Sequence, residues 1–103
     1  MLNYQIAPEA VDDLLGIARY TIRTWGKEQA QSYETTLERC FAVITKDVEN
    51  GRVFFKRRPD LRFVRSKHHF VFYLIEKDKS PLILAIFHER MDLINRLKKR
   101  LDP

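Results

Sequence analysis

The sequence predicts an α+β domain in which an antiparallel helical hairpin packs on a small, mainly antiparallel β-sheet. Two observations predict this class. Apolar residues recur at steps of three and four in the first half of the chain, as in amphipathic helices, whereas the second half contains short apolar runs that are typical of strands. The 103 residues include no internal repeat or low-complexity linker, so we expect residues 1–103 to form a single domain.

The first half predicts a short strand followed by two long helices. The strand, at residues 4–6, ends before Pro8, whose missing N–H suits the first turn of a helix. Gly26 should end the first helix and Asn50-Gly51 the second, because glycine adopts the left-handed conformation of a helix end. With so short a connection, the helices must fold back as a hairpin. Their expected buried stripes are Val11, Leu14, Leu15, Ala18, Ile22 and Trp25, and Ala30, Tyr33, Leu37, Phe41, Ile44 and Val48.

The second half predicts three strands, at residues 61–65, 69–76 and 82–88, after a basic loop that carries Pro59. The last two strands are apolar on nearly every residue, so both faces of the sheet need cover, and the helical hairpin covers only one. Two explanations carry equal weight. In the first, the sheet is strongly twisted, or the C-terminal segment at 91–101, which has leucines at helical spacing, covers the second face as a short helix or tail. In the second, a partner chain covers that face.

Composition limits the classes of function. Lys and Arg number 19 against 14 Asp and Glu, and the net charge of +5 favours an acidic partner such as a nucleic acid, a ribosome or an acidic protein segment. The single cysteine, Cys40, excludes an internal disulfide, and its place within a helix favours a packed thiol over a nucleophile. The apolar runs are far shorter than the roughly 20 residues that span a bilayer, and the N-terminus lacks the pattern of a signal peptide. We therefore expect a cytoplasmic chain without a membrane partner.

The sequence favours neither a metal site nor a cofactor site. His68 and His69 are adjacent, and neighbouring residues on a strand point to opposite faces, so these two cannot bind one ion together. The three glycines are isolated, and no phosphate-binding loop is present. We expect no metal and no cofactor.

Metal-independent RNA cleavage is the reaction for which suitable residue types are present. It needs a general base, a general acid and cations that stabilise the phosphorane charge. Arg58, Arg62, Arg65, Tyr73 and His88 are of these types and lie on predicted strands or strand ends. Positive residues are also routine at sheet edges, where they keep the edge from pairing, and this structural interpretation is the favoured one.

The segment at residues 88–92, His-Glu-Arg-Met-Asp, is the most unusual string in the chain. It joins an apolar strand to the polar C-terminal segment and places four ionisable groups around one methionine. A structural latch at the point where the chain leaves the sheet and a recognition site are equally good interpretations.

Several short strings occur in an order that is familiar. They are Pro8-Glu9-Ala10 with Asp13-Leu14 and Ile17; Trp25-Gly26 with Gln29-Ala30 and Tyr33; Gly51-Arg52; Pro59-Asp60-Leu61-Arg62; His69 with Phe72-Tyr73; and His88-Glu89-Arg90-Met91-Asp92. Together they resemble the ParE toxins of the RelE/ParE toxin–antitoxin superfamily, from about residue 6 to residue 97.

This resemblance implies a helical hairpin on a small antiparallel sheet and a function in plasmid or chromosome stability. It implies a growth-inhibiting toxin that binds and inhibits DNA gyrase without chemistry of its own, neutralised by a ParD-like antitoxin. Such antitoxins have a DNA-binding N-terminal half and a disordered tail that folds over the toxin, so no sequence-specific DNA binding is expected of this chain alone. The residues expected to engage the target are Arg58, Arg62, Arg65, His88, Arg90, Met91 and Asp92, and those expected to contact the antitoxin are Phe63, Val71, Tyr73 and Trp25.

Two alternatives remain from the sequence. The RelE branch of the superfamily cleaves messenger RNA on the ribosome with basic residues and a C-terminal tyrosine or histidine. This chain has no tyrosine after Tyr73, so His88 would take that place, with Arg62, Arg65 and Tyr73 beside it. The other alternative is a member of the superfamily that binds its antitoxin and nothing else.

Overall fold

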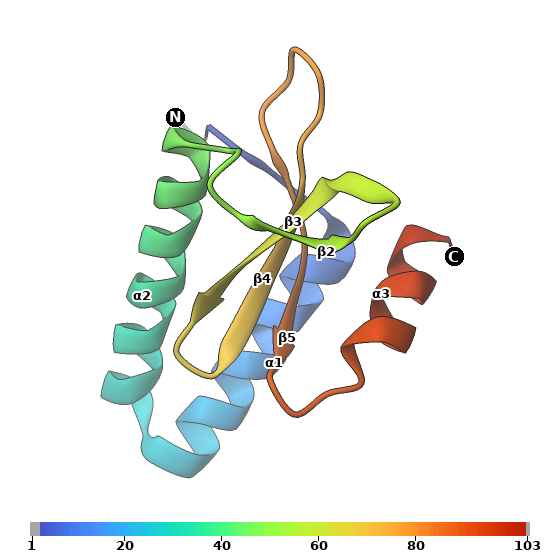
Figure 1. Ribbon diagram of the computed structural model, residues 1–103. Helices are drawn as coiled ribbons and strands as arrows, with labels where there is room; N and C mark the ends of the chain where they lie inside the picture. Colours follow the sequence, from blue (N-terminus) through green and yellow to red (C-terminus); the bar gives the residue numbers. More distant parts are fainter. Residues whose placement is uncertain (1–2, 103) are drawn as a thin grey trace.

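The computed structural model describes residues 3–102 and has the predicted α+β fold (Figure 1). A five-stranded sheet of order β1-β5-β4-β3-β2 is antiparallel except for the β1–β5 pair. Helices α1 and α2 cover one face and α3 lies against the other. No helix of the described residues is long and apolar enough to cross a membrane. The elements are β1 (Gln5–Ile6), α1 (Pro8–Trp25), α2 (Lys27–Lys46), β2 (Arg52–Phe55), β3 (Arg58–Ser66), β4 (His69–Leu74), β5 (Leu82–His88) and α3 (Leu93–Leu101).

The helical hairpin turns on a single residue, as predicted. Gly26 has φ of +96°, a backbone conformation that side chains other than glycine rarely adopt. Its N–H donates to the carbonyl oxygens of Thr21 and Ile22, and its own carbonyl accepts from Ala30 at the start of α2. The end of one helix and the beginning of the next therefore share one residue, which forces α2 back along α1.

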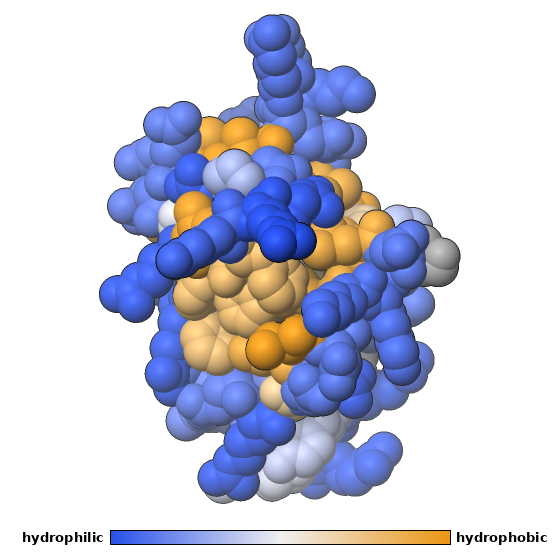
Figure 2. Space-filling model, turned by 45° about the vertical axis from the view of Figure 1, so that its right-hand side comes forward, coloured by the Kyte–Doolittle hydropathy of each residue, from blue (hydrophilic) through white to orange (hydrophobic). Residues whose placement is uncertain are grey.

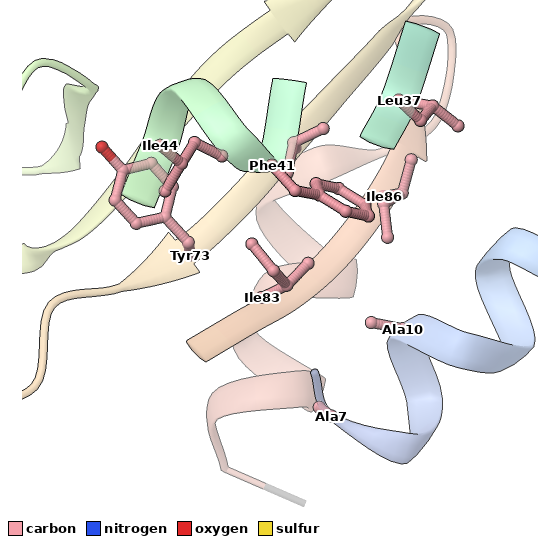
Figure 3. Close-up of a cluster of buried hydrophobic side chains, with 9 residues drawn as sticks. Ala7, Ala10, Leu37, Phe41, Ile44, Tyr73, Ile83 and Ile86 are labelled. Atoms are coloured by element: carbon pink, nitrogen blue, oxygen red, sulfur yellow. The ribbon is translucent and has the colours of Figure 1, made fainter. Parts of the chain in front are cut away.

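The core between the hairpin and the sheet uses the predicted stripe of α2. Leu37, Phe41 and Ile44 are at most 2% exposed and pack against Ile83 and Ile86 of β5 (Figure 3). The phenyl ring of Phe41 also meets Tyr4 edge-on, with ring centroids 5.3 Å apart. Burial of about five large side chains contributes roughly 10 kcal/mol of gross stabilisation, at about 2 kcal/mol each.

The prediction for α1 was wrong in its orientation. Apart from Leu14, the side chains that α1 packs on the core are Ala10, Ile17 and Thr21, a row a quarter turn away from most of the predicted stripe. Ala10 and Thr21 are small, which lets the helix axis approach the sheet closely, and the Thr21 hydroxyl is satisfied by the Ile17 carbonyl at 2.7 Å. The exposed members of the predicted stripe are Val11, Leu15, Ile22 and Trp25.

The end of α2 also differs from the prediction. The helix ends at Lys46, and Gly51 is required for another reason. The Tyr73 hydroxyl donates to the carbonyl of Val48 at 2.7 Å and accepts from the N–H of Gly51 at 3.0 Å. A Cβ atom at Gly51 would lie 2.2 Å from that hydroxyl, so only glycine permits this approach. Gly51 therefore allows a buried tyrosine to hold the segment after α2.

The predicted basic loop before the sheet is in fact a strand and a turn. β2 pairs with β3, and β3 begins three residues earlier than predicted, with Pro59 inside it. The pairing is irregular between Val53 and Phe55, close to the turn, where a residue without an N–H donor is tolerated. The run of basic residues obscured β2 in the sequence pattern, because this strand has only four residues.

The first explanation for the cover of the second face holds for part of it. The C-terminal segment forms α3, and Leu97 is completely buried against the sheet beside Leu61, Phe72 and Phe87. The area over β2 and β3 is left partly open. Helix α3 therefore covers only part of this face of the sheet.

One polar junction ties α1, β5 and α3 together. Because β1 pairs with β5 only at Leu82 and Ile83, the edge of β5 is open beyond them. There the Asp13 carboxylate accepts from the N–H of Ile86 at 3.0 Å, and Arg100 donates to the carbonyl of Leu84 at 3.1 Å. Arg100 also forms a bidentate ion pair with Asp13, at 2.7 and 2.9 Å, with side-chain exposures of 19% and 15%.

Removal of one partner from this junction should destabilise the fold strongly. Asp13→Ala would leave the Ile86 N–H without its acceptor and the Arg100 guanidinium without its counter-charge, with only the Leu84 carbonyl as acceptor, in a poorly solvated place. We expect a loss of about 3 kcal/mol in the free energy of unfolding, measured by urea denaturation. The neighbouring, exposed Asp12→Ala is the matched control, with an expected change within about 0.5 kcal/mol. Equal losses in the two variants would contradict the assigned role.

Candidate interaction surfaces

The outer face of the sheet carries a partly exposed cluster of phenylalanine rings, which we call the aromatic patch: Phe54, Phe55, Phe63 and Phe70. They surround the buried ring of Phe72. Phe54 meets Phe55, Phe63 and Phe72 edge-on, with ring centroids 4.8, 5.6 and 5.3 Å apart. Figure 2 shows an apolar area on this side of the molecule, framed by hydrophilic side chains. Contiguous apolar surface with a polar rim is typical of a protein-binding site.

A groove of about 720 Å³ borders the aromatic patch, between the β2–β3 turn and the end of α3. Phe54, Phe55 and Leu101 supply its apolar lining. The cations along it are Lys56, Arg57, Lys98 and Lys99. Within the described residues, none of these four forms an ion pair. The groove therefore combines apolar area with unpaired positive charge, which suits an acidic segment with apolar side chains.

A second polar cluster lies where the β3–β4 turn meets the end of β5. His69 and His88 are cross-strand neighbours, and the His68 ring stacks on that of His88 with centroids 6.4 Å apart. Glu89 accepts from Arg65 and contacts Nδ1 of His68 at 2.9 Å. These two partners help to hold the pKa of the Glu89 carboxyl below its ordinary value, with the hydrogen bond from His68 as the largest cause.

Within this cluster, His69 is held neutral. Burial first, and then the neighbouring His88 and His68, lower the pKa of His69 from 6.5 to about 4. Its Nδ1 contacts the hydroxyl of Tyr33 on α2, whose pKa burial raises to about 12. A protonated phenol and a neutral imidazole are matched as donor and acceptor. His69 therefore joins the sheet to the helical hairpin.

The arginines expected at the target site do not share one role. Arg58 forms a bidentate pair with Asp60, at 2.9 and 3.0 Å. Arg62 donates to the backbone carbonyls of Pro59, Glu49 and Gly51, so it clamps β3 to the segment after α2. Arg65 is the most exposed of the three, at 57% of its side chain, and its guanidinium also lies over the Phe70 ring.

The segment at 88–92 forms a tight turn into α3. The N–H of Arg90 donates to His88 Nδ1 at 3.1 Å, and the N–H of Met91 donates to the carbonyl of His88. Asp92 is the N-cap of α3 and accepts from the backbone and side-chain amides of Asn95. Asp92 thus has a structural role, whereas the side chains of Arg90 and Met91 are exposed.

The residues of the ribonuclease interpretation are not brought to one place. Tyr73 and His88 lie at opposite ends of the β4–β5 pairing, four residues apart along β4, or about 13 Å. Arg62 pairs opposite Tyr73 and Arg65 opposite Phe70, so the two arginines point to opposite faces of the sheet. Tyr73 is fully buried, and its hydroxyl is used by the segment after α2.

Two of the four residues expected to contact the antitoxin lie in the core, which corrects that expectation. Val71 and Tyr73 are 0% exposed and face the helical hairpin, so they offer no surface to a partner. Phe63 belongs to the aromatic patch, and Trp25 is 70% exposed at the end of α1. Cys40 is a half-buried thiol, and burial raises its pKa to about 11, as suits a packed rather than a reactive group.

Sequence reasoning missed several members of these surfaces. Phe54 and Phe55 were hidden by the basic run that follows them, although two adjacent phenylalanines are a signal for a strand. Glu89 was named only as part of the string at 88–92, and no sequence signal connects it with Arg65, 24 residues earlier. Between residues 3 and 102, no group of three or more His, Cys, Asp or Glu side chains is placed to hold a metal ion.

Known proteins share this fold. The structure of the "Chromosomal ParDE TA system from P. aeruginosa" superimposes with a TM-score of 0.71 over 85% of this chain and 96% of that chain, at 17% sequence identity. A likeness at this identity assigns the fold class alone.

The sequence comparisons identify the family. "Toxin ParE" of Escherichia coli is 41% identical over 101 residues, 98% of each chain. "Toxin ParE1" of Mycobacterium tuberculosis (strain CDC 1551 / Oshkosh) is 27% identical over 95 residues, 92% of this chain and 97% of that protein. The sequence model of the ParE toxins of type II toxin–antitoxin systems, parDE, matches residues 4–93. The chain belongs to this family and is the toxin of a ParDE toxin–antitoxin system, which implies a ParD antitoxin as partner.

Acidification should destabilise the fold through His69. The pKa of His69 is about 4 in the folded chain, whereas the ordinary value of 6.5 applies to the unfolded chain. Between these pH values the unfolded chain therefore binds more protons than the folded chain. The contribution of neutral His69 to the free energy of unfolding is therefore fully present above about pH 6.5, and it is lost as the pH is lowered toward 4. Urea denaturation at about pH 5 and about pH 7.5 measures this difference.

The variant His69→Gln removes the titrating group and should reduce the difference in stability between the two pH values. His68→Gln should change that difference much less, because His68 is exposed and is the smallest of the three causes that lower the pKa of His69. An unaltered pH dependence in His69→Gln would remove His69 as its cause.

Proposed function

We propose that this ParE-family toxin inhibits DNA gyrase by direct binding, without catalysis, and that a ParD-type antitoxin neutralises it by covering the outer face of the sheet. The observation that carries the proposal is the aromatic patch together with the unpaired cations of the groove beside it. Exposed apolar area next to unpaired charge favours association with another protein. The residues of the alternative, ribosome-dependent ribonuclease are spread over both faces of the sheet, and Tyr73 and Arg62 are occupied with backbone groups.

The antitoxin surface is supported by shape and charge. The aromatic patch consists of half-buried rings in an area that α3 leaves open. A segment that folds onto it would bury apolar area, and each Å² buried would favour binding by roughly 25 cal/mol. The groove beside it has four cations without ion pairs, which an acidic segment would neutralise. A disordered tail suits this surface, because it can follow the patch and the groove together.

The target surface is supported by the exposed part of the polar cluster. Arg65 and Arg90 are exposed cations at the turn at 88–92, where Arg65 pairs with Glu89, and the exposed Met91 lies between Arg90 and α3 in the sequence. Arginine and methionine are favoured where proteins bind one another. Arg62 holds β3 to the segment after α2, so its replacement would combine a loss of binding with a change of fold. Arg65 and Arg90 are the better residues to test.

Reversal of the exposed charges should weaken inhibition of gyrase. With the purified full chain in a gyrase supercoiling assay, Arg65→Glu together with Arg90→Glu should raise the concentration for half-inhibition at least about tenfold, because each arginine at an interface centre is worth about 2 kcal/mol. The wild-type chain should also cause cleaved DNA to accumulate, and the antitoxin should reverse both effects.

The matched control is Lys79→Glu in the exposed loop between β4 and β5, which should inhibit like the wild type. Circular dichroism checks that all variants are folded. If the folded wild-type chain leaves gyrase unaffected and primer extension finds cuts inside translated codons, the ribonuclease replaces this proposal. If expression without antitoxin is harmless, the chain is a member of the family that binds only its antitoxin.

Damage to the aromatic patch should weaken antitoxin binding. Phe63→Glu places a charge among the rings, and Lys98→Glu with Lys99→Glu reverses part of the rim while leaving the rings in place. Each change should raise the dissociation constant of a ParD-type antitoxin at least about tenfold in isothermal titration calorimetry. Val43→Glu, at an exposed apolar residue of α2, is the control and should bind normally. Normal binding by both patch variants would place the antitoxin elsewhere.

A further inference from the structure

The charge of this chain is divided unevenly between its two halves. Residues 1–50, which include α1 and α2, carry 5 basic and 8 acidic side chains, whereas residues 51–103 carry 14 basic and 6 acidic side chains. The net charges of the two halves are therefore −3 and +8. Because α1 and α2 cover one face of the sheet and α3 lies on the other, the molecule has a positive side, which is the side of α3 (Figure 1).

The exposed side of α3 concentrates this positive charge. Leu97 is buried against the sheet, so at about 100° per residue Lys99 points away from the sheet. The side chains of Arg96 and Lys98 then lie on opposite flanks of the helix. Lys98 lines the groove beside the aromatic patch, and Arg96 lines a separate hollow of about 420 Å³ on the other flank. All three cations are exposed, and we call them the α3 crest.

The α3 crest is not neutralised within the part of the chain that the structure describes. None of its three cations forms an ion pair among residues 3–102. The carboxylates that precede the helix already have partners: Asp92 caps α3 and accepts from Asn95, and Glu89 pairs with Arg65. The positive charge of the crest is therefore left for a partner.

The dipole of α3 accounts for only part of this charge. Lys98 and Lys99 lie in the last turn, where cations stabilise the negative end of a helix. Arg96 lies in the middle of the helix, and the unpaired Lys56 and Arg57 lie across the groove on the β2–β3 turn. Cations that extend from one flank of a helix to a neighbouring turn fit an extended polyanion rather than a single small anion.

The side chains around the crest indicate which polyanion. Proteins bind single strands of nucleic acid by stacking the bases on aromatic rings, and residues 93–101 contain no aromatic side chain. An acidic protein segment with apolar side chains would settle in the groove and leave Arg96, on the other flank, without a counter-charge. Duplex DNA carries one negative charge per about 1.7 Å of its axis, and lysine and arginine contact its phosphates without reading the bases. The backbone of a duplex therefore matches the α3 crest best.

We propose that the free toxin binds the phosphate backbone of duplex DNA through the α3 crest, without sequence preference. The crest follows directly after the turn at 88–92, whose exposed cations are assigned above to gyrase. Under that proposed function, the toxin contacts gyrase and the DNA that gyrase holds with adjacent surfaces. The link to gyrase rests on the proposed function, whereas the binding of DNA by the free chain does not.

Fluorescence anisotropy of a labelled duplex measures this binding with the full chain and without gyrase. For a duplex of about 20 base pairs in about 50 mM salt, we expect a dissociation constant on the order of 10 µM. The logarithm of the affinity should fall with the logarithm of the salt concentration with a slope of roughly −3, because each of the three phosphate contacts contributes about −0.9. A duplex of unrelated sequence should bind within about threefold, because phosphate contacts carry no sequence information.

The test variant is Arg96→Gln with Lys99→Gln. It should raise the dissociation constant at least about tenfold and make the salt slope shallower by about 2, because two phosphate contacts are lost. The matched control, Arg23→Gln with Lys46→Gln, removes the same charge from exposed positions on α1 and α2 and should bind within about threefold of the wild type. All four positions are exposed, so both variants should remain folded, which circular dichroism checks.

A wild-type chain that shows no binding up to about 200 µM, some twentyfold above the expected dissociation constant, would overturn the proposal. Equal losses in the two double variants would also overturn it, because the binding would then follow net charge and not the crest.

Other polyanions are the remaining arms of the same assay. Tighter binding of a single strand of the same sequence than of the duplex would replace the proposal with stacking of bases on the aromatic patch. Tighter binding of an RNA hairpin would replace duplex DNA with RNA. If poly-glutamate displaces the labelled duplex as well as unlabelled duplex of equal charge does, the crest belongs to an acidic protein segment.

The two proposals fail separately. A toxin that inhibits gyrase but does not bind the duplex alone contradicts only the DNA contact. A toxin that binds the duplex through the crest and leaves gyrase unaffected contradicts only the proposed function.

Discussion

The ion pair between Asp13 and Arg100 couples the helices on the two faces of the sheet. It joins a helix on one face of the sheet to a helix on the other, across the edge of β5 that the short β1 leaves open. Both partners also satisfy backbone groups of that edge, at Ile86 and Leu84. A poorly solvated pair is a weak source of net stability but a strong source of specificity, because each partner is costly without the other. It therefore fixes the rotation of α1 and the position of α3 together.

Two exposed apolar surfaces follow from this arrangement. With α1 held by Asp13, the row Ala10, Ile17 and Thr21 faces the core. The exposed apolar residues of α1 are then Val11, Leu15, Ile22 and Trp25. With α3 held by Arg100, Leu97 covers the half of the outer sheet face near β5 and leaves the aromatic patch open. A toxin that must be bound by other proteins keeps such surfaces at a cost in solubility, and the net charge of +5 offsets that cost.

The basic residues divide into those that build the fold and those that remain available. Arg62 and Tyr73 hold the segment between α2 and β2, and Arg58 is paired with Asp60. Arg90 is exposed at the opposite end of the sheet, Arg65 is exposed there although it pairs with Glu89, and the lysines of the groove are exposed at the outer face. A count of cations in the sequence could not separate these groups, because their partners include backbone carbonyls, which every residue carries.

The fold class, the hairpin at Gly26 and the buried stripe of α2 could be predicted from the sequence, because periodicity and glycine conformation act over a few residues, and the ordered short strings carried the family resemblance. Features that depend on residues far apart in the sequence emerged only in the folded chain. α1 offered two apolar rows, and a hydrogen bond to β5, 73 residues away, selected the less hydrophobic one for the core. Gly51 proved to be a place of close approach, and Val71 and Tyr73 proved to be core, because local pattern cannot tell which face of a two-sided strand a helix covers. The candidate surfaces are likewise what remains after the core has been chosen, so only the folded chain defines them.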